Sequence, residues 1–327
     1  MPPNTTSCEG ATKTHAGEAL ECSSWCKAAF GSRHCVDCKC TACDFCAKRA
    51  PIFHDDERSQ LFASAAAPAH GKAALDSLSH RWLVLIGDSS MRMLFHFLLG
   101  ALTLDWQEWP SELSEGHGPD PPPPAWLAVL QGPTCLDQHE TQCMEDALLD
   151  DEGRKLRLTC LWTDFGDVET LGALQALTEA SSSPADGVIV GFGAWWVWHR
   201  PTMSSQYAEA VQQLLGHLDG MFPSALTTKV FAATTSCGRK DFDQPEGDAA
   251  ARVTDHFNNL AKRHVLQTKA WSWFDRDVVT GFVCDVEHDC AGNQYTSRFH
   301  PAGSALNALV DLLLTQLSRS WVNSAVR

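Results

Sequence analysis

From Trp82 onward, short apolar runs alternate with segments of helical periodicity. The apolar runs predict strands over residues 83–86, 155–162, 188–192 and 229–233. The periodic segments predict helices over residues 91–102, 168–180, 206–218, 249–266 and 304–317. Because strands and helices alternate, we expect an α/β fold: a doubly wound parallel sheet with helices on both faces and its functional site at the carboxyl ends of the strands.

The cysteines predict a separate module before this region. Eight of the 14 cysteines lie within the first 46 residues, where large apolar side chains are few, so covalent or metal cross-links must replace a core. The even number and the sequon Asn4-Thr5-Thr6 favour disulfides in an oxidising compartment. Zinc is the alternative, because Cys35–Cys38 and Cys43–Cys46 have ligand-like spacing and His34 is adjacent. We predict disulfides and no metal.

Composition changes after this module. Small and polar residues dominate up to residue 80, which predicts a Cys-rich module at 1–50, a linker at 51–80 and an α/β domain at 81–327. Within that domain, the consecutive prolines 121–124 predict a surface loop over residues 111–124. The acidic run 145–153 is expected to be a hydrated approach to a hairpin.

Two further disulfides are candidates in the α/β domain, namely Cys135 with Cys143 and Cys160 with Cys237. Free buried thiols are the alternative for these four residues.

Charge and hydropathy exclude several classes of partner. The net charge of -15 repels phosphate backbones and anionic lipids, so we expect no nucleic-acid partner. No run of 18 apolar residues occurs, so we expect no membrane span in this chain. The first residues lack the charged and apolar regions of a signal peptide, so a secretory protein would have its targeting segment missing here. With no dinucleotide fingerprint and no P-loop, we expect no cofactor.

The stretch Gly87-Asp88-Ser89 follows the first predicted strand and precedes a helix. A serine at such a turn exposes its hydroxyl where the helix N-terminus stabilises developing negative charge. Taken alone, the tripeptide leaves two interpretations open: Ser89 is a nucleophile, or Ser89 or Ser90 caps the helix.

Three sequence blocks, in a fixed order along the chain, favour the nucleophile over the helix cap for Ser89. The first is Gly87-Asp88-Ser89-Ser90-Met91-Arg92, the second runs from Ala185 to the paired Trp195-Trp196, and the third is Phe299-His300-Pro301 before the last helix. Together they resemble the trichome birefringence-like and PC-esterase branch of the SGNH (GDSL) hydrolase superfamily, which includes polysaccharide and sialic acid O-acetyltransferases. The similarity spans about residues 81–318. It implies a flavodoxin-like sheet of the SGNH type, with Ser89 as nucleophile and His300 as base.

The same resemblance implies an oxyanion site formed by the backbone N–H groups of Ser89 and Gly193. This chain has Gly191 where that branch commonly has an asparagine that donates a further hydrogen bond. It also has Ser297 where the family places an aspartate three residues before the histidine.

Three catalytic arrangements therefore stay open. In the first, Ser89 and His300 act with a displaced carboxylate, Asp285 or Asp289; in the second, Ser89 acts with Asp285 and His288; in the third, Ser89 and His300 act alone. The loop that carries these acids is bracketed by Cys284 and Cys290. The acids alternatively form a solvated loop that binds a cation.

Arg92, Trp195 and Trp196 are candidate substrate-binding residues. The tryptophans, with nearby Trp198, His199 and Arg200, follow the end of a predicted strand and suit stacking against a sugar; core packing is the alternative. Arg92 suits a hydrogen bond to a substrate oxygen or a salt bridge on the helix surface.

These residues predict an O-acyl esterase or acyltransferase, most simply for O-acetyl groups of carbohydrate, that uses an acyl-serine intermediate. Its partners would be a glycan and an acyl donor, in the Golgi lumen or outside the cell. Two alternatives remain: a catalytically inactive SGNH-fold protein that binds glycans or other extracellular partners, and a zinc protein of the reducing cytosol.

Overall fold

The computed structural model describes residues 78–102, 143–151, 154–235, 246–276, 279–280, 295–297, 300–301 and 303–325. The predicted Cys-rich module and the linker up to residue 77 lie outside these residues. Asp285, His288 and Asp289 also lie outside them.

Six strands form one sheet in the order β2-β3-β1-β4-β5-β6. They are β1 (Arg81–Gly87), β2 (Met144–Asp151), β3 (Arg154–Trp162), β4 (Gly187–Gly191), β5 (Thr228–Ala232) and β6 (Ser272–Phe274). All neighbours are parallel except β2 and β3, which form an antiparallel pair. Counted along the chain, the five parallel strands lie in the order 2-1-3-4-5, which is that of a doubly wound, flavodoxin-like sheet. The predicted α/β fold is confirmed, and the sheet is mostly parallel. The antiparallel edge strand β2 departs from the fully parallel sheet that was predicted.

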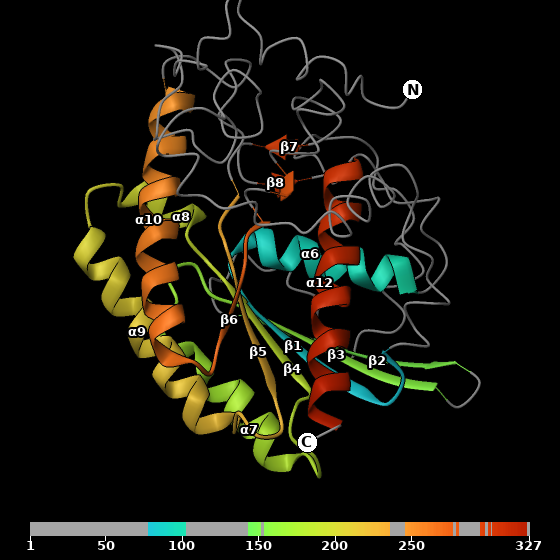
Figure 1. The fold of residues 1–327 in the computed structure, drawn as a ribbon. Coiled ribbons are helices and arrows are strands. Elements are labelled where there is room, and N and C mark those ends of the chain that lie inside the picture. Colours follow the sequence, from blue (N-terminus) through green and yellow to red (C-terminus); the bar gives the residue numbers. More distant parts are fainter. Residues whose placement is uncertain are drawn as a thin grey trace, which may run out of the picture.

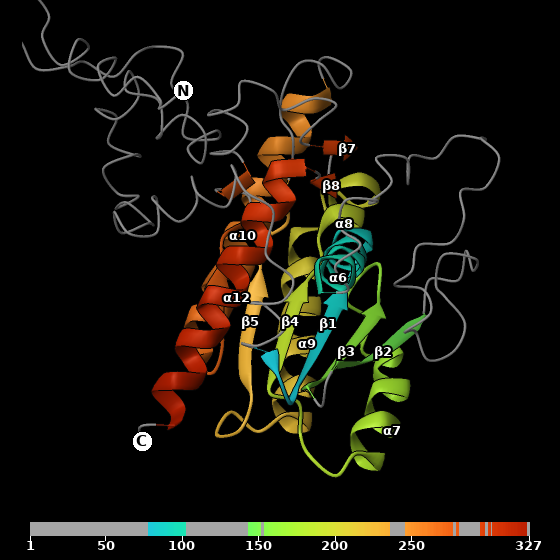
Figure 2. The same cartoon turned by 90° about the vertical axis from the view of Figure 1, so that its right-hand side faces the viewer.

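Helices cover both faces of this sheet. They are α6 (Ser89–Leu102), the 3₁₀ turn η4 (Val168–Leu171), α7 (Gly172–Ala180), α8 (Ala194–His199), α9 (Ser204–Met221), α10 (Glu246–Thr268) and α12 (Gly303–Ala325). Figures 1 and 2 show α9 and α10 on one face and α6 and α12 on the other. The short strands β7 (Tyr295–Ser297) and β8 (His300–Pro301) pair with each other beyond the carboxyl ends of the main strands (Figure 1).

Strand β1 contributes to the core on both faces. Leu83 and Leu85 pack in the cluster that contains α6 and α12, whereas Val84 and Ile86 pack in the cluster that contains α7, α8, α9 and α10. Because both faces are covered, the parallel strands read as continuous apolar runs, and this is why they could be found in the sequence.

The acidic run forms the edge strand β2, and its side chains alternate between buried and more exposed positions. Glu145 is 1% exposed, and its Oε2 lies 2.8 Å from Nε2 of the buried His96 on α6. Ala147 and Leu149 also point inward, while Asp150 is exposed. The expected hydration is therefore wrong for Glu145, because successive residues of a strand face opposite sides of the sheet.

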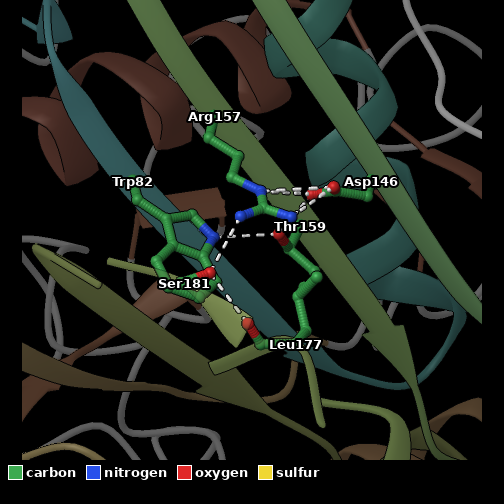
Figure 3. A network of polar contacts seen from close by, with 6 residues as sticks. All are labelled: Trp82, Asp146, Arg157, Thr159, Leu177 and Ser181. Carbon is green, nitrogen blue, oxygen red and sulfur yellow. Dashed lines mark hydrogen bonds and ion pairs between the residues drawn. The ribbon is translucent and has the colours of Figure 1, made fainter. Parts of the chain in front are cut away.

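A polar network joins β1, β2, β3 and the end of α7 (Figure 3). The Arg157 guanidinium donates to both carboxylate oxygens of Asp146, at 2.8 to 3.2 Å, and to the Ser181 hydroxyl at 3.1 Å. The Thr159 hydroxyl donates to Asp146 at 2.7 Å and accepts from the Trp82 indole N–H at 2.9 Å. This network ties the antiparallel strand β2 to the parallel part of the sheet.

The two cysteines that the structure describes, Cys143 and Cys160, differ in oxidation state. Cys143 is disulfide-bonded, and its partner lies outside the described residues. Cys160 is a free, buried thiol, which overturns the candidate pairing with Cys237. Burial is the main cause that raises the pKa of the Cys160 thiol, so this group stays protonated at neutral pH.

Among the helices that the structure describes, none combines the length and the apolar character needed to cross a membrane.

Candidate functional site

The carboxyl ends of β1 and β4 meet at the switch point of the sheet. From β1 the chain moves to β3 on one side, and from β4 it moves to β5 on the other. Gly87 and Gly191 are paired in register at these two ends, and the Asp88 N–H donates to the Gly191 carbonyl at 3.3 Å. In open α/β sheets this crevice is where ligands bind.

Two glycines allow the backbone segments to approach this closely. A Cβ atom on Gly87, whose φ is +156°, would lie 1.8 Å from the Gly191 carbonyl oxygen. A Cβ atom on Gly193, whose φ is +155°, would lie 2.2 Å from Oγ1 of Thr234. Neither position accepts a side chain without movement of its neighbours.

The Asp88 carboxylate is fully buried and binds both sides of the switch point. Its Oδ1 accepts hydrogen bonds from the Ser90 N–H at 3.0 Å and the Ser90 hydroxyl at 2.6 Å. Its Oδ2 accepts from the N–H groups of Gly193 at 3.0 Å and Ala194 at 2.9 Å. One carboxylate therefore caps the N-termini of both α6 and α8. Sequence reasoning missed this role because it began the helix at residue 91; α6 begins at Ser89, and aspartate directly before a helix is an N-cap signal.

The two serines after Asp88 have different surroundings. Ser89 is the first residue of α6 and is half-buried. Ser90 is 2% exposed, and its hydroxyl donates to Asp88 and accepts from Nη2 of the buried Arg276 at 3.3 Å. The side-chain cap that the sequence left open between Ser89 and Ser90 is thus supplied by Asp88, and of the two serines Ser89 is the more accessible to a ligand.

The Gly193 N–H points to Asp88 rather than toward a ligand. A buried N–H that donates to a carboxylate is already satisfied and does not stabilise an acyl oxyanion in the same geometry. This corrects the expectation that Gly193 supplies an oxyanion donor in the structure as it stands. Ser89 is left as the predicted donor from the strand-to-helix turn.

The backbone of His300 lies on the side of the sheet that carries Ser89. β8 packs against α6, and Figures 1 and 2 both show it beside that helix, beyond the carboxyl ends of the strands. Ser297 on β7 is the backbone partner of His300. The fold therefore brings the two chain segments of the predicted serine and histidine to one edge.

The tryptophans of α8 divide between core and surface. Trp196 is 3% exposed, donates its indole N–H to the Phe165 carbonyl at 3.1 Å and packs edge-on against Tyr207. Core packing, the alternative for this residue, therefore replaces the expected substrate contact. Trp195 is half-buried and stacks on His199 at 4.8 Å between ring centroids, and Trp198 is 60% exposed. Trp195, Trp198 and His199 form an aromatic face of α8.

Arg92 follows Ser89 by nearly one helical turn. Its guanidinium lies over the indole ring of Trp162, 4.2 Å from the ring centroid, which is a cation–π contact. The side chain is half-buried and so keeps contact with both the core edge and solvent.

Asp164 is a candidate site residue that sequence reasoning missed. It lies just after β3, is 4% exposed, and its Oδ1 makes no hydrogen bond of ordinary geometry. Burial is the main cause that raises its pKa to about 6; Asp88 and Asp167 add to the rise, whereas Trp162 and Arg92 oppose it. An aspartate after the end of a strand was the available signal, and its burial was not readable from the sequence.

Within the described ranges, no group of three or more His, Cys, Asp or Glu side chains is arranged to hold a metal ion.

Comparison of the chain with protein-family models and with curated proteins gave no match.

Proposed function

We propose that this protein is a serine-dependent O-acyl esterase or acyltransferase that acts on O-acetyl groups of carbohydrate, on an α/β domain of the SGNH type. One observation carries the proposal: Ser89 stands half-buried at the N-terminus of a 14-residue helix at the switch point, while Asp88 performs the capping. A serine in that place has the positive end of the helix dipole next to it.

In the proposed mechanism, Ser89 Oγ attacks the acyl carbonyl carbon while His300 accepts the serine proton. The Ser89 N–H stabilises the oxyanion, and His300 returns its proton to the departing sugar oxygen. Water or a second sugar hydroxyl then attacks the acyl-serine ester and releases Ser89. Asp285 or Asp289 would orient His300; Asp285 with His288, or no carboxylate at all, are the other arrangements.

Substrate contacts would come from the rim of the switch point. The aromatic face of α8, formed by Trp195, Trp198 and His199, suits stacking against a sugar ring. Arg92 lies between the Ser89 turn and Trp162, where its guanidinium suits a substrate oxygen.

An oxidising compartment fits the cysteines best. Cys143 is disulfide-bonded, and the eight cysteines of residues 1–50 form the proposed disulfide-linked module. We therefore place the protein in the secretory pathway or outside the cell.

Release of acetate tests the proposal. Wild-type protein is expected to release acetate from acetylated xylan or from p-nitrophenyl acetate, and Ser89→Ala is expected to lower the rate at least a hundredfold. Ser182→Ala, an exposed serine at the end of α7, is the control and should keep the wild-type rate. Equal rates for wild type and Ser89→Ala would contradict the proposal.

A glycan-binding protein without catalysis is the second candidate. Gly191 in place of the family asparagine and the engaged Gly193 N–H both reduce the number of oxyanion donors, and these two observations favour it. A folded wild-type protein that binds glycans and releases no acetate would establish this alternative.

A further inference from the structure

Two buried polar atoms at the carboxyl end of β3 make no hydrogen bond of ordinary geometry. They are Nε1 of Trp162 and Oδ1 of Asp164, and among the described side chains no other buried nitrogen or oxygen shares this property. Burying polar atoms unpaired is unfavourable, so such atoms in a folded protein require an explanation.

The two atoms are chemically complementary. The Trp162 indole N–H is a donor, whereas the Asp164 carboxylate is an acceptor. A weak hydrogen bond from the indole to that carboxyl group, outside ordinary hydrogen-bond geometry, lowers the pKa of Asp164. A hydroxyl group donates one hydrogen bond and accepts another, so one hydroxyl between these two atoms satisfies both.

Their position links them to the switch point. Trp162 is the register partner of Gly87, and the Thr163 N–H donates to the Gly87 carbonyl at 2.8 Å. The pair therefore flanks the turn that carries Ser89. Arg92, on the first turn of α6, lies over the Trp162 ring, 4.2 Å from its centroid.

The surrounding charge selects the kind of hydroxyl compound. Asp88 and Asp167 both lie close enough to Asp164 to raise its pKa, and Arg92 is the cation that opposes them. An acidic sugar would add a carboxylate to three others, whereas a neutral sugar would meet no such repulsion.

We propose that Trp162 and Asp164 form a subsite that binds one hydroxyl group of a neutral sugar beside Ser89. The sugar O–H donates to Asp164 and its oxygen accepts from the Trp162 indole. This inference names the substrate class of the proposed function and rests on it. A buried water has the same chemistry, so the test must separate the two sources.

The test follows the indole N–H resonance of Trp162 in the full chain carrying Ser89→Ala. Its absence in Trp162→Phe identifies it among the 12 tryptophans. Titration with xylotetraose, cellotetraose and mannotetraose is expected to shift it for at least one of them, and trigalacturonate is expected to leave it in place. In the same background, Asp164→Asn and Trp162→Phe are each expected to raise the Kd of that neutral sugar about tenfold.

Trp271→Phe is the matched control. Trp271 also lies beside an aspartate, but its indole N–H is satisfied by Asp219 at 2.9 Å, at the amino ends of the strands. This variant should keep the Kd. A resonance that no neutral sugar moves, or a Kd that both subsite variants leave unchanged, would assign the two atoms to water and overturn the inference.

Failure of the subsite is distinguishable from failure of the proposed function. If the protein releases acetate but no neutral sugar shifts the Trp162 resonance, the subsite alone is overturned. A resonance that responds to neutral sugars in a protein with no acetate release would overturn the proposed function and leave the subsite standing.

Discussion

Replacing Asp88 with asparagine is expected to lower the free energy of unfolding by about 3 to 5 kcal/mol. The carboxylate accepts four buried hydrogen bonds, two from Ser90 and one each from the N–H groups of Gly193 and Ala194. An amide has one acceptor oxygen, so its NH2 group must face N–H donors on one side and leave at least one of them unpaired. A buried unpaired donor carries its full desolvation cost.

Urea denaturation followed by circular dichroism measures this loss. Asp150→Asn is the control, because Asp150 is exposed on β2 and lies 3.6 Å from Lys155; it should change the stability by less than about 0.5 kcal/mol. An Asp88→Asn variant within about 1 kcal/mol of wild type would refute the role of Asp88 as the cap of both helices.

Replacing Asp164 with asparagine is expected to stabilise the protein by about 2 to 3 kcal/mol at pH 7.5 and to change little near pH 3.5. The pKa of Asp164 is about 6 in the folded protein and 3.8 as its ordinary value, chiefly because the carboxyl group is buried. The folded state therefore holds this proton to higher pH than the unfolded state does.

The sign follows from the protons bound in each state. Between pH 3.8 and about 6 the unfolded chain has lost the proton and the folded chain keeps it, so stability falls as the pH rises. Above that range Asp164 is ionised in both states, and its buried carboxylate lowers the stability of the folded protein by a constant amount. Asparagine cannot ionise, so the variant does not lose this stability.

The stability difference between Asp164→Asn and wild type, measured by urea denaturation from pH 3.5 to 7.5, isolates this group from the other carboxylates. A difference that stays constant across this range would contradict the raised pKa. Because Asp164→Asn is expected to stabilise the fold, any loss of sugar binding in that variant cannot be attributed to unfolding.

The main strands were predictable because both faces of β1, β4 and β5 are buried, which leaves uninterrupted apolar runs in the sequence. The edge strand β2 was missed because its outward side chains are acidic and mask the alternation that turns Glu145 inward. β6 was missed because three residues are too short for a periodic signal.

The position of the candidate site was predictable from topology, whereas its contacts were not. Ser89 follows a strand in any parallel arrangement, so the carboxyl edge was the expected place. The sharing of Asp88 between α6 and α8 depends on residues 105 and 106 positions away, and no local pattern encodes such a contact. Burial of Trp196 likewise depends on Phe165, which is 31 residues away, and on Tyr207 of the next helix.

Covalent labelling of the full chain by a fluorophosphonate tests most directly whether Ser89 is an activated nucleophile. Elsewhere in the structure, Ser204 Oγ lies 2.9 Å from His256 Nε2, so Ser204→Ala is the control. We expect the probe on the Ser89 peptide; Ser89→Ala and His300→Ala should abolish labelling, and Ser204→Ala should keep it. A folded wild-type protein that stays unlabelled, or a label on Ser204, would contradict the account.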